Sequence, residues 1–193
     1  MTFKSAFALM LILEMLALVL GVVSHGWSLE GLQAVTRYSG RVSLAIFSLI
    51  FLFYNHPQVN VRRLLSDKFF LVFAIAHFIH LCELVTYVYY SGNPVIPIRL
   101  LGGFVAYAII FAMPWIQMRF EDQRLSEKQF NAAALIYLYY VWFIFFMTYL
   151  PRVRGTLPGV GGSYKEFVIL LGWVSIMMGF KWSQLLAKPR RRS

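Results

Sequence analysis

The chain has few charged residues for its length. Only 13% of its 193 residues are Asp, Glu, Lys or Arg, whereas 60% are hydrophobic and 18% are aromatic. A water-soluble domain of this size cannot hide so large an apolar fraction in its own core. The composition therefore predicts an integral membrane protein, and it leaves no stretch for a soluble domain.

Cysteine is almost absent, since Cys82 stands alone and excludes an intramolecular disulfide. Its position inside an apolar run favours a buried, inert thiol. No nucleophile stands beside a base in the sequence, and the Gly-rich segment 152–165 lacks the Gly-Lys-Ser/Thr ending of a phosphate loop. These absences do not favour a hydrolytic or a nucleotide-binding enzyme.

Apolar runs, by contrast, fill the chain. An α-helix needs about 20 apolar residues to cross the hydrocarbon of a bilayer, and six runs approach that length. They predict an all-α, polytopic membrane protein with one transmembrane domain over residues 1–193. The expected helices are residues 3–23, 39–55, 69–90, 98–118, 130–150 and 167–186.

Breaks in these runs set the expected helix ends. Glu14 interrupts the first run, so we expect a retained span rather than a cleaved signal peptide. The polar segment 24–38 predicts a loop or a short helix at the membrane interface. Pro151 is expected to stop the fifth helix, because proline lacks the backbone donor that a helix interior requires.

The basic residues suggest an orientation. With the N-terminus in the cytoplasm, twice as many Lys and Arg residues fall inside as outside, so the positive-inside rule predicts that both termini are cytoplasmic. Anionic lipid beside these residues accounts for most of the net charge of +10. Membrane lipids are therefore expected partners. Because the basic residues are spread over every loop, nucleic acid is not an expected partner.

Three ionisable residues, His77, His80 and Glu83, lie in the run 69–90. At about 100° per residue they cover roughly a third of the helix circumference. Such groups are costly in hydrocarbon and usually face a protein interior, a cofactor or a water-filled cavity. Glu14 is a further intramembrane acid, expected to partner Arg41 or a histidine, or to mark an inward face.

Several roles are open to this polar face. Either histidine is able to ligate a haem iron while the other orients it, binds a propionate or ligates a second site. Glu83 would then accept a hydrogen bond from His80 or line a proton path. Alternatively, both histidines form interhelical hydrogen bonds to backbone carbonyls or to the hydroxyls of Ser43, Ser48 or Tyr107. A zinc or di-metal site that includes Glu14 is a third hypothesis, although no Glu-x-x-His motif is present.

Three motifs, in this order, carry a family resemblance. They are Thr36-Arg37-x-Ser39-Gly40-Arg41, then Ala76-His77-x-x-His80-Leu81, then Tyr139-Tyr140-Val141-Trp142 with Tyr149 and Arg152 further on. In these residues the chain resembles small bacterial proteins with a ferric-reductase-like transmembrane domain. Those proteins are similar to the six-helix haem-b cores of ferric reductases, NADPH oxidases and the haem-binding subunit of the methionine-sulfoxide reductase system.

The resemblance, which covers the second to fifth helices, implies a function. It implies that haem b is bound, with His77 or His80 ligating the iron and Arg41 in the cofactor site. It further implies electron transfer in a bacterial inner (cytoplasmic) membrane, as an oxidoreductase component that exchanges electrons with a quinone or a redox partner protein.

The fifth helix departs from the family pattern, which places a histidine shortly before Tyr139 and Tyr140. This chain has Ala132-Ala133-Ala134 there, and residues 130–150 contain no histidine. Met113 and Met147 are candidate thioether ligands, although methionine in such a helix usually packs. A five-coordinate haem, a ligand from a partner subunit and a haem-free bundle remain as hypotheses.

Two other functions therefore stay beside the redox function. One is a haem-free membrane subunit or scaffold that binds partner proteins or lipid through its aromatic fifth helix. The other is a proton-linked transporter that uses Glu14, Glu83 and the two histidines.

Overall fold

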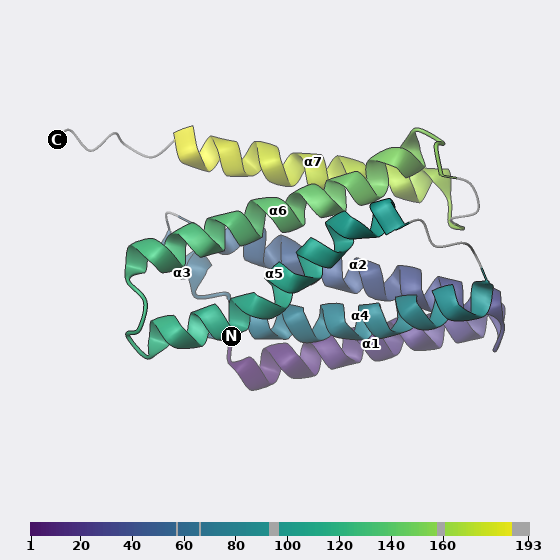
Figure 1. The fold of residues 1–193 in the computed structure, drawn as a ribbon, viewed down its shortest axis with the longest axis horizontal. Helices are drawn as coiled ribbons and strands as arrows, with labels where there is room; N and C mark the ends of the chain where they lie inside the picture. Colours follow the sequence, from purple (N-terminus) through teal and green to yellow (C-terminus); the bar gives the residue numbers. More distant parts are fainter. Residues whose placement is uncertain (57, 66, 93–96, 158–160, 187–193) are drawn as a thin grey trace.

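The computed structural model describes residues 1–56, 58–65, 67–92, 97–157 and 161–186, and the regular structure in these residues is helical. Six long helices are long and apolar enough to cross a membrane, which confirms the predicted all-α, six-span fold. In chain order the helices are α1 (Phe3–His25), α2 (Leu29–Phe53), the short α3 (Val59–Arg62), α4 (Phe69–Ser91), α5 (Pro97–Glu121), α6 (Glu127–Val153) and α7 (Tyr164–Leu186) (Figure 1).

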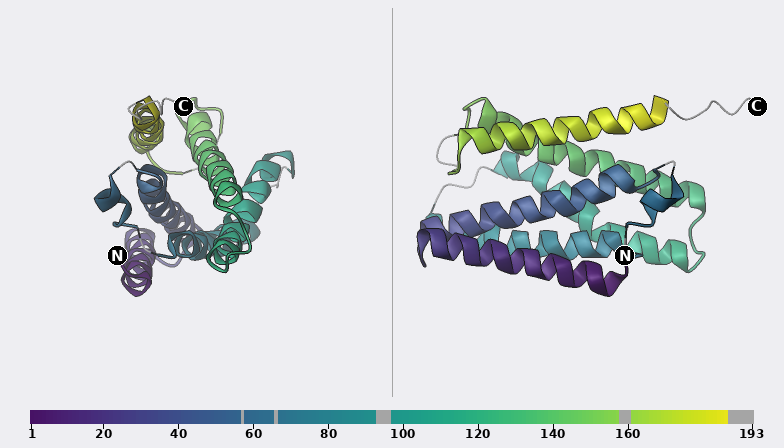
Figure 2. Two further views of the ribbon diagram at one scale, coloured as in Figure 1. Left: turned by 90° about the vertical axis from the view of Figure 1, so that its left-hand side faces the viewer. Right: turned by 180° about the vertical axis from the view of Figure 1, so that it is seen from behind.

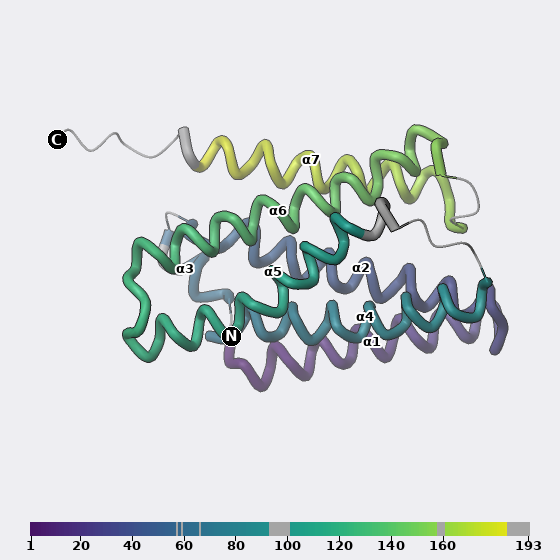
Figure 3. Tube along the Cα trace, viewed as in Figure 1, coloured from purple at the N-terminus to yellow at the C-terminus, as the bar shows by residue number. Residues whose placement is uncertain are grey.

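The six long helices lie close to one axis, with α5 the most inclined, and successive helices run in opposite directions (Figure 3). The start of α1 and the end of α7 therefore lie at the same end of the bundle. Residues 187–193, which include the predicted cytoplasmic C-terminus, lie outside the described residues. Seen end-on, the other long helices form a curved row beside α2 (Figure 2). Since α2 contacts α1, α4, α6 and α7, it is the helix around which the others pack.

The start of α2 differs from the prediction. Most of the segment expected as a loop or interfacial helix belongs to this span, which begins at Leu29. Ser28 caps it by accepting a hydrogen bond from the backbone N–H of Gly31 at 3.1 Å. Thr36 in this segment is buried against other helices, whereas Glu30 in the first turn is exposed. Thr36 therefore lies in protein rather than in water, which hydropathy alone does not reveal.

Both ends of α6 also extend beyond the prediction. A capping box of Ser126 and Gln129 starts the helix at Glu127. At the other end Pro151 lies inside the helix, so the expectation that it stops the helix is wrong. Pro151 lies in the last turn of α6, which ends at Val153, so the missing backbone donor costs the helix only its bond to the Met147 carbonyl. In the same turn the Arg152 guanidinium donates to the Thr148 carbonyl.

The core beneath the candidate site is aromatic and centred on Phe47 of α2, which has no exposed surface. Its ring centroid lies 5.6 Å from that of Phe73 of α4 and 5.4 Å from that of Phe145 of α6. Rings at such separations attract each other beyond simple burial. This contact fixes α2, α4 and α6 where the histidines of α4 project.

Candidate functional site

A cavity of about 300 Å³ lies among α2, α4, α5, α6 and α7. Its volume is at the lower end of the range for small-molecule sites. Both histidines singled out in the sequence line it, as does Arg41. The polar lining residues are Thr36, Arg37, Arg41, His77, His80, Tyr107, Thr148, Tyr149 and Arg152.

The imidazole of His77 is directed toward α5 and α6. It stacks on Phe73 with ring centroids 5.2 Å apart, and it lies 4.8 Å from the Tyr107 ring and 6.1 Å from the Phe145 ring. Its Nδ1 atom is buried and has no hydrogen-bond partner among the described residues. A buried imidazole without a partner leaves its bonding capacity open to a ligand.

The imidazole of His80 is directed toward α2 instead. A Cβ added to Gly40 would lie 3.1 Å from its Cε1 atom, and the ring interacts with the backbone of Thr36. Its centroid is 5.5 Å from that of His77. Its Nδ1 atom, like that of His77, has no hydrogen-bond partner in the described part of the chain. The absence of a side chain at Gly40 thus allows the Cε1 end of this ring to approach α2 closely.

The hypothesis of interhelical hydrogen bonds to serine fails for both candidate serines. The hydroxyl of Ser43 has no hydrogen-bond partner among the residues described. Ser48 donates to the Leu44 carbonyl at 2.7 Å and accepts from Trp173 of α7 at 2.9 Å. Of the interactions considered for this hypothesis, the contact between His80 and the backbone of Thr36 is present.

Three arginines, Arg37, Arg41 and Arg152, line the cavity. Of these, only Arg41 was predicted to belong to the cofactor site. This arginine forms an ion pair of 2.8 Å with Glu166 of α7. Of the alternatives for Glu14, pairing with Arg41 is therefore wrong. Arg37 donates to Gln33 at 3.5 Å, while its Nε atom is buried without a partner in the described residues. Arg37 and Arg152 both stand in the motifs that carry the family resemblance, and Arg37 lies four residues from Arg41 on the same helix face.

The fifth span offers no iron ligand beside His77. The side chains of α6 that line the cavity near His77 include Val141 and Phe145, which have no donor atom. Ala134 is fully buried and does not lie opposite the histidines. It lies one turn from Tyr137, whose ring is 4.9 Å from that of Phe70, nearer the start of α4.

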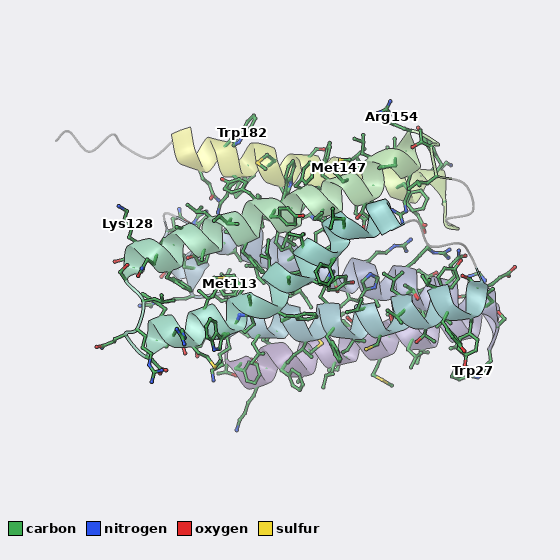
Figure 4. The ribbon with its side chains drawn as sticks, in the orientation of Figure 1. Trp27, Met113, Lys128, Met147, Arg154 and Trp182 are labelled. Atoms are coloured by element: carbon green, nitrogen blue, oxygen red, sulfur yellow. The ribbon has the colours of Figure 1, made fainter. Side chains whose placement is uncertain are left out.

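The two methionines considered as thioether ligands do not line the cavity either. Met113 is buried in the hydrophobic core of the bundle. Met147 is 42% exposed on α6, and Figure 4 shows the two residues on different helices, well apart. Neither is therefore placed to complete the coordination of an iron held by a histidine of α4.

The acidic residues form a separate group. Glu14 of α1 is 6% exposed, and neither of its carboxyl oxygens has a hydrogen-bond partner in the described residues. It interacts with Ser39 of α2, as does Glu83 of α4. The predicted polar face of α4 is therefore divided: its histidines line the cavity, whereas Glu83 is turned toward α1.

Two further expectations concern metal and thiol chemistry. Among the described residues, no three His, Cys, Asp or Glu side chains come together to hold a metal ion, so the zinc or di-metal hypothesis has no ligand set there. Cys82 is exposed rather than buried. It lies about 200° from His80 around the helix, and this places it on the outer surface of α4.

Comparison of the chain with family models, with curated proteins and with solved structures finds no match. The fold and the cavity define the class, a multi-pass helical membrane protein with a histidine- and arginine-lined cavity between its spans.

Proposed function

We propose that this chain is a ferric-reductase-like membrane protein that binds haem b and transfers electrons, with His77 or His80 ligating the iron. The observation that supports this proposal is the presence, in one cavity, of two imidazoles with unbonded nitrogens and three arginines. Imidazole is a usual axial ligand of haem iron, and guanidinium groups pair well with carboxylates such as haem propionates.

The residues present fit a haem with one protein ligand. Arg37, Arg41 and Arg152 would hold the propionates, and the bound group would supply one-electron redox chemistry. At Gly103 of α5, which also lines the cavity, an added Cβ would meet nothing within 4 Å. The cavity is therefore open beside Gly103. Electrons would be exchanged with a quinone or with a redox partner protein.

The test is the absorbance spectrum of the protein purified in detergent after haem-replete expression. We expect a Soret band that is lost or shifted in His77→Ala or in His80→Ala, and the affected variant identifies the ligand. His56→Ala is the matched control, because His56 lies outside the cavity and stacks on Phe180. A single protein ligand also means that added carbon monoxide should bind the reduced form without displacing a protein side chain.

A correctly folded protein without haem would overturn the proposal and favour the haem-free subunit or scaffold. Spectra that stay unchanged in both single variants and in the double variant would refute the assignment of the ligand. Helix content measured by circular dichroism separates either result from misfolding.

We further propose that the chain lies in the bacterial inner membrane with both termini cytoplasmic. Lys128 and Arg154 lie at opposite ends of α6 (Figure 4). In a Cys82→Ser background, an impermeant maleimide added to intact spheroplasts should label Arg154→Cys and spare Lys128→Cys. The reverse labelling pattern would contradict the proposed orientation.

A further inference from the structure

Helices α1, α2 and α4 enclose a second polar group that is distinct from the cavity of the histidines. Its members are Glu14 of α1, Ser39 of α2 and Glu83 of α4. Ser39 has no exposed surface and Glu14 is 6% exposed. The serine hydroxyl interacts with both carboxyls, and the carboxyls interact with each other. None of the buried oxygens of the three side chains has a hydrogen bond of regular geometry among the described residues.

No cation in the described part of the chain is paired with these carboxyls. Arg41 is paired with Glu166, and Arg37 donates to Gln33. The ionisable side chains nearest the group come from two of the packed helices. Helix α1 contributes Glu14 itself, and α4 contributes Glu83 together with His80, which lies one turn from Glu83. The contribution of α2 is Ser39, which carries no charge. A buried carboxylate without a cation, such as that of Glu14, is strongly unfavourable because it loses its hydration, and the nearby, partly buried Glu83 carboxylate adds repulsion.

The group is accessible from one end of the bundle. A cavity of about 530 Å³ lies where α1 joins α2, and Gly26, Trp27, Ser28 and Glu83 are among its lining residues. Trp27 is 89% exposed at this end (Figure 4). The side chain of Glu83 therefore lies between this cavity and the buried Ser39 and Glu14.

We propose that Glu14, Ser39 and Glu83 form a proton-binding site within the membrane, which is filled from the aqueous phase at the Trp27 end. A proton from water in the cavity binds the Glu83 carboxylate. The Ser39 hydroxyl then accepts that proton while donating its own to Glu14, so that one proton moves inward and no other atom is exchanged. A carboxyl that carries a proton becomes a hydrogen-bond donor. The protonated carboxyl is then able to donate to one of the buried oxygens of this group, which have no partner in the described residues.

This site does not depend on the binding of haem. It also uses residues that the redox proposal leaves without a role, because Glu14 and Ser39 do not line the cavity of the histidines. If haem is bound, the carboxyl pair lies one turn of α4 from His80 and is placed to take up a proton when an electron arrives.

The experiment is infrared spectroscopy of the haem-free protein in lipid near neutral pH. A protonated carboxyl in an apolar environment gives a C=O stretching band that exposed, ionised carboxylates do not give. We expect this band in the wild-type protein, a shift of the band in D₂O, and its loss in the double variant Glu14→Gln/Glu83→Gln. Glu30→Gln is the matched control, since Glu30 is an exposed acid at the start of α2, and it should keep the band.

Absence of the band in the wild-type protein, or a band that persists in the double variant, would overturn the proposal. Protein carrying ¹³C-labelled glutamate assigns the band without any substitution, so the test remains decisive even if the double variant does not fold. Ser39→Ala should keep the band but slow its exchange in D₂O, because the hydroxyl that links the carboxyls is removed. Unchanged exchange would exclude the serine from the path.

Discussion

The imidazole of His80 lies so close to α2 that a Cβ on Gly40 would come within 3.1 Å of the ring atom Cε1. Any residue larger than glycine at this position would therefore require the ring to move by a few tenths of an ångström. This contact ties the position of one candidate ligand to one backbone position on the central helix.

The first prediction is that Gly40→Ala destabilises the protein although alanine favours helix. Overpacking of this kind typically costs about 1–3 kcal/mol, and the ring must shift to relieve it. Thermal unfolding in detergent measures the loss. Gly103→Ala is the control, because Gly103 lines the same cavity and its added Cβ would meet nothing within 4 Å. Equal melting temperatures for the two variants would contradict the prediction.

The second prediction concerns the approach of α1 to α2. A Cβ on Gly21 would lie 2.8 Å from the backbone nitrogen of Val35, and small residues are what allow membrane helices to pack so closely. Because a backbone atom cannot move aside as a side chain can, Gly21→Ala should cost at least as much as Gly40→Ala, about 1–3 kcal/mol or more. Gly172→Ala, with open space around the added Cβ, should unfold like the wild type; if it loses as much stability, the packing argument is wrong.

The third prediction is a pH dependence at Tyr54, which follows α2 outside the spans. Its hydroxyl donates to Asn131 at 3.1 Å, and burial together with the nearby Glu127 carboxylate raises the pKa of Tyr54 from 10.0 to about 12. A pKa raised in the folded state gives stability that is fully present below the unfolded value and is lost as the pH rises through the folded one. This contribution should therefore disappear between pH 10.0 and about 12.

The difference in phenolate absorbance between the wild type and Tyr54→Phe measures the titration. Glu127→Gln should move its midpoint downward, since the charge is removed, but leave most of the shift, since burial is the larger cause. A midpoint for the wild type at the ordinary tyrosine value would show that the ring is hydrated in solution.

The fourth prediction is that the ion pair of Arg41 and Glu166 contributes little to stability. The two side chains are 26% and 43% exposed, and exposed pairs are typically worth about 0–1 kcal/mol. A double-mutant cycle with Arg41→Gln and Glu166→Gln should give a coupling energy within that range. A much larger coupling would mean that the pair is shielded from solvent in the membrane.

The six spans were predictable because bilayer thickness sets their length and the apolar runs report it directly. Their ends were harder to predict. The segment from Leu29 to Tyr38 resembles a loop by hydropathy, yet it forms helix, in which Thr36 is buried and Gln33 donates to Tyr87 of α4. Pro151 resembles a helix stop, yet it lies inside the last turn of α6, where the missing donor removes only one backbone hydrogen bond.

The candidate site was predictable to the extent that one helix carries it. Helical spacing placed His77 and His80 on one face, and both line one cavity. Helical spacing alone could not show that Glu83, another 60° around α4, is turned toward α1 and away from the two histidines. Pairs such as Arg41 and Glu166, 125 residues apart, depend on the tertiary fold. Haem binding and electron transfer remain predictions from resemblance and from the chemistry of the cavity.

The central position of α2 has a consequence for biogenesis. It is the least apolar of the six spans, and it is made second, before α4, α6 and α7 exist to cover its buried polar residues. The last span completes the arrangement when the Lys181 ammonium donates to the Tyr54 carbonyl at 2.7 Å, just after the end of α2. A nascent chain that has inserted only its first spans therefore exposes hydroxyls to lipid, and it should depend on an insertase or chaperone until its C-terminal helices arrive.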